Sequence, residues 1–234
     1  VWVFGNIAQL DNALLQHAID KGLTYHFIEY DYKYCEYRNP TLYEFLEEEE
    51  CDYLATEKAQ LIQNFVNNSA TTFFMSQGQL DIYKQHLSGI NPEKMIVLSS
   101  TFEDDFFDKI DNLKESASDA LRDKWIVLGS RSWVKGSQQS EDWCKQQNID
   151  YEVVSDVSHD EMLKKLSEAK GICFKPTGLD TCPRFVIEAK LLGCELELND
   201  NVQHLNEEWF NTDDLNVTYE YLKNRKEFFW SHVG

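Results

Sequence analysis

Two carboxylates and two cations in the second half of the chain have the right types to bind a polar, anionic ligand. Asp180 and Glu188 stand eight positions apart, and Arg131 and Lys135 stand on an earlier stretch. A carboxylate accepts hydrogen bonds from two neighbouring hydroxyl groups at once. Fixed cations stabilise negative charge that grows on a departing group. With 41 acidic residues in 234, such spacing arises easily by chance, so the elements that carry these residues decide their meaning.

The stretch that carries Asp180 and Glu188 predicts a βαβ unit. A strand, a loop rich in turn residues, a helix and a second strand are expected, in that order, at 171–174, 175–182, 183–192 and 194–198. Pro183 suits a first helical position and Thr181 a cap. Ligands of parallel sheets bind at the carboxyl ends of strands, and a helix start offers N–H donors to an anion. The loop at 175–182 is therefore the predicted site.

The same stretch resembles a known family. PTGLDTCPRFVIEAKLLGCELELND, residues 176–200, is similar to the signature region of retaining glycosyltransferases of the GT-B type. These enzymes have an acidic residue, seven intervening residues and a Glu followed by Ala, then a hydrophobic helix, Gly and a strand. Here Asp180 takes the first acidic position, where Glu is more usual. Glu188 with Ala189, and Gly193, fall where the pattern places them.

The resemblance implies a role for each matching residue. Arg131 and Lys135 would clamp the diphosphate of a nucleotide sugar, Glu188 would bind its ribose, and Asp180 would contact its sugar hydroxyls. Backbone N–H groups at the helix start would bind the same diphosphate. The implied donor-binding set is Gly129, Arg131, Lys135, Gly178, Asp180, Thr181, Cys182, Arg184 and Glu188, with Asp180, Arg131 and Lys135 as its catalytic members. No catalytic base is identified.

Strands alternate with helices along the whole chain, which predicts an α/β protein with parallel sheets. With the resemblance, we expect two Rossmann-like domains, a cleft between them, and a C-terminal helix returning to the first domain. The expected parts are an N-terminal, acceptor-side domain that begins inside a strand and is possibly truncated, a linker with a helix, a nucleotide-sugar-binding domain and an aromatic-rich final helix, at 1–102, 103–123, 124–216 and 217–234.

A second candidate region follows an early strand. Asp31, Tyr32 and Lys33 open a loop dense in aromatic and charged residues. Aromatic faces and carboxylates suit a sugar acceptor, and packing of the aromatics between layers explains the loop equally well. Of the six histidines, His159 and His204 could line a base-binding edge, but we expect both to be structural.

Composition limits the classes of function. A net charge of −19 disfavours nucleic acid and anionic membranes as partners. No apolar run reaches the roughly 18 residues of a membrane span, and no signal peptide is visible. The six cysteines form no metal-binding spacing and fit a reducing cytoplasm. We expect no metal site and no cofactor, with the nucleotide sugar as substrate.

The resulting hypothesis is a cytoplasmic, metal-independent glycosyltransferase that acts with retention on a hydroxyl acceptor. Both predicted domains are short for the family, and the first lacks an evident glycine-rich opening loop. A non-catalytic sugar-nucleotide-binding or assembly module of the same fold is therefore the main alternative. A sugar-nucleotide epimerase is a further alternative, but no convincing set of His and carboxylates supports it.

Overall fold

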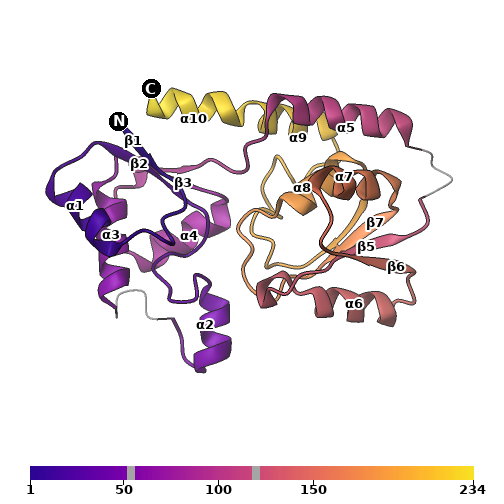
Figure 1. The fold of residues 1–234 in the computed structure, drawn as a ribbon, viewed down its shortest axis with the longest axis horizontal. Coiled ribbons are helices and arrows are strands. Elements are labelled where there is room, and N and C mark those ends of the chain that lie inside the picture. The colour runs from indigo at the N-terminus through magenta and orange to yellow at the C-terminus, as the bar shows by residue number, and fades with distance from the viewer. Residues whose placement is uncertain (52–55, 118–121) are drawn as a thin grey trace. The chain divides into compact units, whose positions relative to one another are not determined.

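The structure is a computed structural model that describes residues 1–51, 56–117 and 122–234 (Figure 1). It divides into two compact units. The first comprises Val1–Ser100 together with Asn224–Gly234, and the second comprises Thr101–Lys223. The part of the expected linker at 118–121 lies outside the described residues.

The first unit contains a four-stranded parallel sheet in the order β1-β2-β3-β4. Adjacent strands are in parallel register, with Phe27 of β2 opposite Thr72 of β3. Its strands and helices are β1 (Trp2–Phe4), α1 (Asn12–Asp20), β2 (Tyr25–Glu29), α2 (Pro40–Glu47), α3 (Glu57–Asn68), β3 (Thr71–Phe74), α4 (Gln77–His86), η1 (Pro92–Lys94), β4 (Met95–Val97) and α10 (Arg225–Val233).

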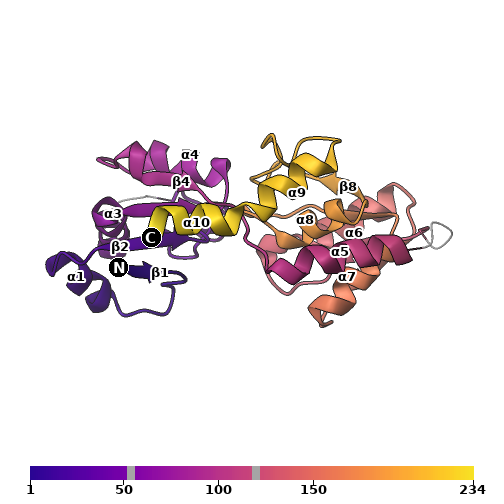
Figure 2. The ribbon, with the colours of Figure 1, turned by 90° about the horizontal axis from the view of Figure 1, so that it is seen from above.

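Alternating side chains of this sheet pack against helices on its two faces. On one face, Tyr25 of β2 stacks on Phe65 of α3, with ring centroids 4.4 Å apart. On the other, Phe73 of β3 contacts Phe229 of α10 at 5.0 Å. Helix α10 lies along this second face (Figure 2). The period-two alternation of a strand accounts for both layers.

The second unit contains another four-stranded parallel sheet, in the order β6-β5-β7-β8. Its strands and helices are α5 (Asp104–Ser116), β5 (Trp125–Leu128), η3 (Trp133–Lys135), α6 (Ser137–Gln146), β6 (Tyr151–Val154), α7 (His159–Glu168), β7 (Gly171–Phe174), α8 (Arg184–Leu191), β8 (Glu195–Leu198) and α9 (Leu215–Lys223). Because β5 and β7 are neighbours, the loops that follow them lie at the same edge of the sheet.

This second sheet is also covered on both faces. Val127 of β5 and Cys173 of β7 form a buried cluster with Cys144 of α6. On the opposite face, Phe174 of β7 contacts Phe185 of α8, with centroids 5.8 Å apart. Each unit is thus a helix-covered parallel sheet, as the alternation of strands and helices predicts.

The aromatic-rich C-terminal segment is two helices and not the single helix expected. Helix α9 ends at Lys223 and α10 begins at Arg225, with Asn224 between them. Tyr219 of α9 packs on Phe107 of α5 in the second unit, whereas Phe229 of α10 packs in the first. The segment therefore supplies apolar surface to both units.

Candidate functional site

The loop after β5 is held by two glycines that no other residue could replace without movement. A Cβ at Gly129 would lie 2.9 Å from the Cβ of Ser155. Gly136 has a φ of +60°, and its Cβ would lie 1.9 Å from the carbonyl oxygen of Lys175. The left-handed conformation and this close approach both favour glycine. The turn therefore brings Lys135 against the loop that follows β7.

Backbone hydrogen bonds join the loops at the carboxyl edge of the second sheet. The N–H groups of Thr177 and Gly178 donate to the carbonyl of Val134, at 3.0 and 3.3 Å. The N–H of Asp180 donates to the carbonyl of Asn201, after β8, at 2.8 Å. Three loops that are far apart in sequence thus form one connected surface.

An ion pair joins two of the predicted residues across these loops. Lys135 Nζ lies 2.7 Å from Asp180 Oδ2. The Asp180 side chain is 9% exposed and that of Lys135 is 35% exposed, so the pair sits at the surface with its carboxylate turned inward. A partly exposed cation held in place by a nearly buried carboxylate can donate charge-assisted hydrogen bonds to an anionic ligand.

Helix α8 starts differently from the sequence-based prediction. It begins at Arg184, and Pro183, with a φ of −66° and a ψ of 111°, is the residue before its first turn. Pro183 is therefore not the first helical residue, and Thr181 does not cap the helix, because no side chain caps it. The extended ψ of Pro183 delays the helix by one residue. Thr181 and Cys182 are buried just before it.

Glu188 is buried in the second turn of α8 and is held by two basic side chains. Its Oε1 lies 2.9 Å from His159 Nε2 and 3.7 Å from Arg184 Nε. Burial raises the pKa of Glu188, and the hydrogen bond and charges of His159 and Arg184 oppose that rise. The carboxylate is thus fixed in position, which a flexible surface glutamate would not be.

Two aromatic residues, Phe102 just before α5 and Phe106 in its first turn, contact these basic groups. His159 lies parallel to Phe106, with centroids 6.4 Å apart. The Arg184 guanidinium lies 4.5 Å from the ring centroid of Phe102. His159 was expected to be structural, so the sequence analysis missed its contact with Glu188. The signal that could have found it is the position of this histidine as the first residue of a helix.

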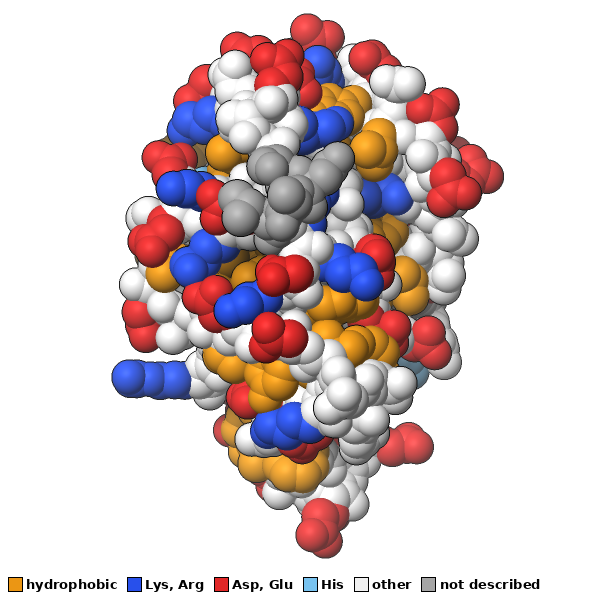
Figure 3. Space-filling view, turned by 90° about the vertical axis from the view of Figure 1, so that its right-hand side faces the viewer, with side chains coloured by type: hydrophobic (Ala, Val, Ile, Leu, Met, Phe, Trp, Pro, Cys, Tyr) orange, Lys and Arg blue, Asp and Glu red, His pale blue; other side chains and the backbone are white. Residues whose placement is uncertain are grey.

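The structure brings some predicted residues together and leaves others apart. Lys135 meets Asp180, and Glu188 meets Arg184, while Arg131 is exposed on the loop after β5. Acidic and basic side chains are interspersed over the face shown in Figure 3. Basic groups therefore reach the surface despite the acidic excess of the chain.

In the first unit, the loop after β2 is mostly packed inside. Tyr32 is 0% and Lys33 2% exposed, whereas the Asp31 side chain is 27% exposed. Tyr32 stacks on Tyr83 with centroids 6.1 Å apart. Of the two explanations of this loop, packing between layers accounts for Tyr32 and Lys33. Asp31 is the member of the three that reaches solvent.

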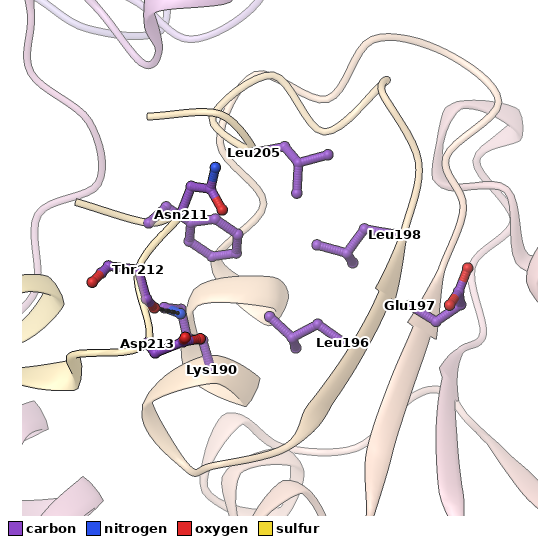
Figure 4. Close-up of a pocket in the computed structure, with 9 residues that line it drawn as sticks. Lys190, Leu196, Glu197, Leu198, Leu205, Asn211, Thr212 and Asp213 are labelled. Carbon is purple, nitrogen blue, oxygen red and sulfur yellow. Dashed lines mark hydrogen bonds between the residues drawn. The ribbon is translucent and has the colours of Figure 1, made fainter. Parts of the chain in front are cut away.

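A separate pocket lies beside the edge strand β8 (Figure 4). Its volume is about 480 Å³, and Leu196 and Leu198 point into it while Glu197 points away. Lys190 donates to the carbonyl of Thr212 at 2.7 Å, and burial lowers its pKa. The lining residues are Lys190, Leu196, Glu197, Leu198, Leu205, Phe210, Asn211, Thr212 and Asp213. None of them belongs to the predicted donor-binding set.

His204 packs against Phe210, one of the residues that line this pocket. It is fully buried, and its ring meets Phe210 edge to face with centroids 4.4 Å apart. Burial lowers the pKa of His204 to about 3, so the ring is neutral near pH 7.

Residues 1–51, 56–117 and 122–234 contain no group of three or more His, Cys, Asp or Glu side chains placed to hold a metal ion. In the same part of the chain, no helix has both the length and the apolar character needed to cross a membrane.

Comparison with known proteins supports the fold. No protein-family model and no curated protein matches the sequence. The solved structure of HepE from Anabaena, in complex with UDP and glucose, is similar with a TM-score of 0.51 at 12% identity, over 93% of this chain and 71% of HepE. Sucrose-phosphate synthase from Thermosynechococcus elongatus gives a TM-score of 0.47 at 10% identity, over 87% of this chain and 62% of the synthase. With its two parallel sheets, this chain has a GT-B-like fold.

Proposed function

We propose that this protein is a glycosyltransferase that moves a sugar from a nucleotide sugar to a hydroxyl acceptor, with retention and without a metal. The observation that carries the proposal is the Lys135–Asp180 ion pair, 2.7 Å long, at the carboxyl edge of the second sheet. Parallel sheets bind ligands at this edge. The pair lies just before α8, where helix N–H groups favour an anion.

Each member of the site has a role in this reaction. Lys135 and Arg131 would stabilise the diphosphate as it departs, and Asp180 would accept hydrogen bonds from the donor sugar. Thr181 and Cys182 would present backbone N–H groups to the diphosphate. Glu188, whose Oε1 lies 2.9 Å from His159 Nε2, would accept hydrogen bonds from both ribose hydroxyls. On the acceptor side, the partly exposed Asp31 is our candidate.

Thermal denaturation with nucleoside diphosphates and their sugars tests the proposal. HepE was solved with UDP and glucose, so UDP and UDP-glucose come first, followed by the adenine and guanine series. A ligand at 100 times its Kd adds about 2.7 kcal/mol to the folded state. We expect one base series to raise the Tm, and the matching sugar nucleotide to be turned over. No shift from any nucleotide would refute the donor site. Binding without turnover would favour the non-catalytic module.

Replacing Glu188 should weaken that binding. Glu188→Gln keeps the shape but removes the charge from a hydrogen-bonded carboxylate, a loss of about 1.5–3 kcal/mol, or roughly ten- to hundred-fold in Kd. Burial raises the pKa of Glu188, so this carboxylate becomes protonated at a higher pH than an exposed glutamate does. Nucleotide binding by the wild type should therefore weaken at that higher pH when the solution is acidified. Isothermal titration of the nucleotide at several pH values measures both effects.

Glu161→Gln is the matched control for this change. Glu161 is exposed in the first turn of α7, two residues after His159. The Glu161→Gln variant should bind the nucleotide with the same Kd as the wild type. Equal Kd values for Glu188→Gln and Glu161→Gln would remove Glu188 from the site.

A further inference from the structure

The pocket beside β8 in the second unit is lined by residues that the proposed donor site does not use (Figure 4). Its volume of about 480 Å³ lies within the roughly 300–1,000 Å³ that is usual for small-molecule sites. Leu196 and Leu198 stand two residues apart on this edge strand, so both side chains point into the pocket. Glu197, between them, points away, and its Oε1 lies 2.6 Å from Lys175 Nζ. The strand thus supplies an aliphatic wall.

The segment 205–213, which contributes the facing wall, is fixed by its own hydrogen bonds. The N–H groups of Phe210 and Asn211 donate to the carbonyl of Glu207, at 2.9 and 2.7 Å. Trp209 Nε1 donates to the Glu207 carboxylate at 2.6 Å. Phe210 is 3% exposed, so its ring is packed in place. Because these bonds already order the wall, a ligand can bind here at a low cost in conformational entropy.

Lys190 contributes a positive charge to the lining of the pocket. It lies in the last turn of α8 and is half-buried. Its Nζ donates to the carbonyl of Thr212 at 2.7 Å and lies 5.3 Å from the ring centroid of Phe210. An ammonium group has three N–H donors, and the bond to Thr212 uses one of them. The amine is therefore held in place and can donate further hydrogen bonds to a ligand.

The surroundings of Lys190 favour a negatively charged ligand. Burial lowers the pKa of Lys190, and the charge of Asp213 opposes this lowering as the smaller effect. A lowered lysine pKa means that the ammonium form is less well stabilised here than in water. A carboxylate in contact with Nζ would compensate for the lost solvation, because a charge-assisted hydrogen bond is strong in a partly buried site.

The aliphatic wall decides what the rest of the ligand can be. A sugar would place hydroxyl groups against Leu196, Leu198 and Leu205, whose side chains cannot hydrogen-bond to them, and such burial is costly. A hydrocarbon chain in the same place gains free energy in proportion to the apolar area that it removes from water. An anionic head with a hydrocarbon body therefore fits both the charge and the wall.

We propose that this pocket binds an amphipathic carboxylic acid of the class of medium-chain fatty acids. The carboxylate accepts hydrogen bonds from Lys190 Nζ, and the hydrocarbon chain lies against Leu196, Leu198 and Leu205. The pocket shares no residue with the proposed donor site, so this inference does not depend on glycosyl transfer.

Isothermal titration of the full chain with sodium octanoate tests the proposal. We expect saturable binding at one site per chain. Heptanoate should bind about fourfold more weakly, because each buried methylene contributes about 0.8 kcal/mol. 1-Octanol has the same chain without the charge and should bind about ten- to hundred-fold more weakly. A lack of saturable octanoate binding, or equal Kd values for octanoate and 1-octanol, would overturn the proposal.

A lysine variant identifies the group that binds the carboxylate. Lys190→Met keeps the length of the side chain but removes its charge, so it should weaken octanoate binding about ten- to hundred-fold and change the Kd of 1-octanol little. Lys164→Met, at an exposed position of α7, is the matched control and should keep the wild-type Kd for octanoate. Octanoate binding that is unchanged in Lys190→Met would contradict the assignment.

Photolabelling of the wild type locates the site even if a variant fails to fold. The full chain is irradiated with a diazirine analogue of octanoic acid, and the labelled peptides are mapped by mass spectrometry. We expect the label within residues 190–213 and its loss when octanoate is added in excess. A label that octanoate suppresses in any other part of the chain would place the acid elsewhere and refute the proposal.

Discussion

Lys135→Ala should reduce the rate of sugar transfer by about 10²–10³-fold, the usual cost of removing one fixed donor from a developing negative charge. The structure holds Lys135 in place, since its Nζ lies 2.7 Å from Asp180 Oδ2. The loss should fall mainly on kcat, because the charge on the diphosphate grows as the bond to the sugar breaks. Steady-state kinetics with the donor found by thermal denaturation measures the effect.

Variants of Asp180, the ion-pair partner of Lys135, distinguish a loss of catalysis from a loss of stability. Lys135→Ala leaves the Asp180 carboxylate, 9% exposed, without its ion pair, which costs stability. Asp180→Asn in the Lys135→Ala background should restore stability, and its turnover should still be lower than that of Asp180→Asn alone, because Asp180 is itself a proposed site residue. Lys145→Ala, an exposed lysine of α6, should leave kcat unchanged. Turnover that recovers along with stability in the double variant would show that Lys135 has a structural role alone.

Lys33→Met should destabilise the first unit, and the loss should grow with pH. Lys33 Nζ lies 3.3 Å from Glu29 Oε1, with both side chains buried, and Tyr83 donates to the other oxygen of Glu29 at 2.7 Å. Breaking a buried ion pair by removing one partner costs about 3–5 kcal/mol. We expect a loss of this size at about pH 8.5, where Glu29 is charged, and a smaller one at about pH 6.

The direction of this pH dependence follows from the pKa of Glu29. Burial raises it to about 7 from an ordinary 4.5, although the Lys33 charge lowers it. A raised acid pKa gives stability that is complete below about 4.5 and is lost as pH rises through about 7. Without Lys33, the pKa of Glu29 rises further, so the loss extends to higher pH.

Urea unfolding of each variant across this range measures the free energy of unfolding. Lys84→Met, at an exposed position of α4, is the matched control and should show no such trend. Adding Glu29→Gln to Lys33→Met should remove the pH dependence. A loss that is the same at both pH values would mean that Lys33 contributes packing and not charge.

Local pattern predicted much of the candidate site. The strand at Gly171–Phe174, the loop after it and the helix with Glu188 were expected within a residue or so, and the structure has β7 and α8 there. Lys135 was expected in the donor-binding set, and the structure shows that the turn after it requires glycine, because Gly136 has a φ of +60°. The N-caps of five helices also depend on neighbouring residues alone. In each, the capping side chain accepts a hydrogen bond from a backbone N–H of the helix that follows, and the capping residues are Asp11, Asn39, Thr56, Ser76 and Ser158.

By itself, the sequence determined the order of strands and helices, because the apolar periods of a strand and a helix extend over a few neighbouring residues. The tertiary structure decided which side chains meet. Lys135 reaches Asp180 across 45 residues because β5 and β7 are adjacent, and His159 reaches Glu188 across 29 because α7 packs beside α8. The tertiary structure likewise buries Lys33 beside the carboxylate of Glu29 in β2, with which it pairs. Such pairings depend on strand order and helix packing, which no local period encodes.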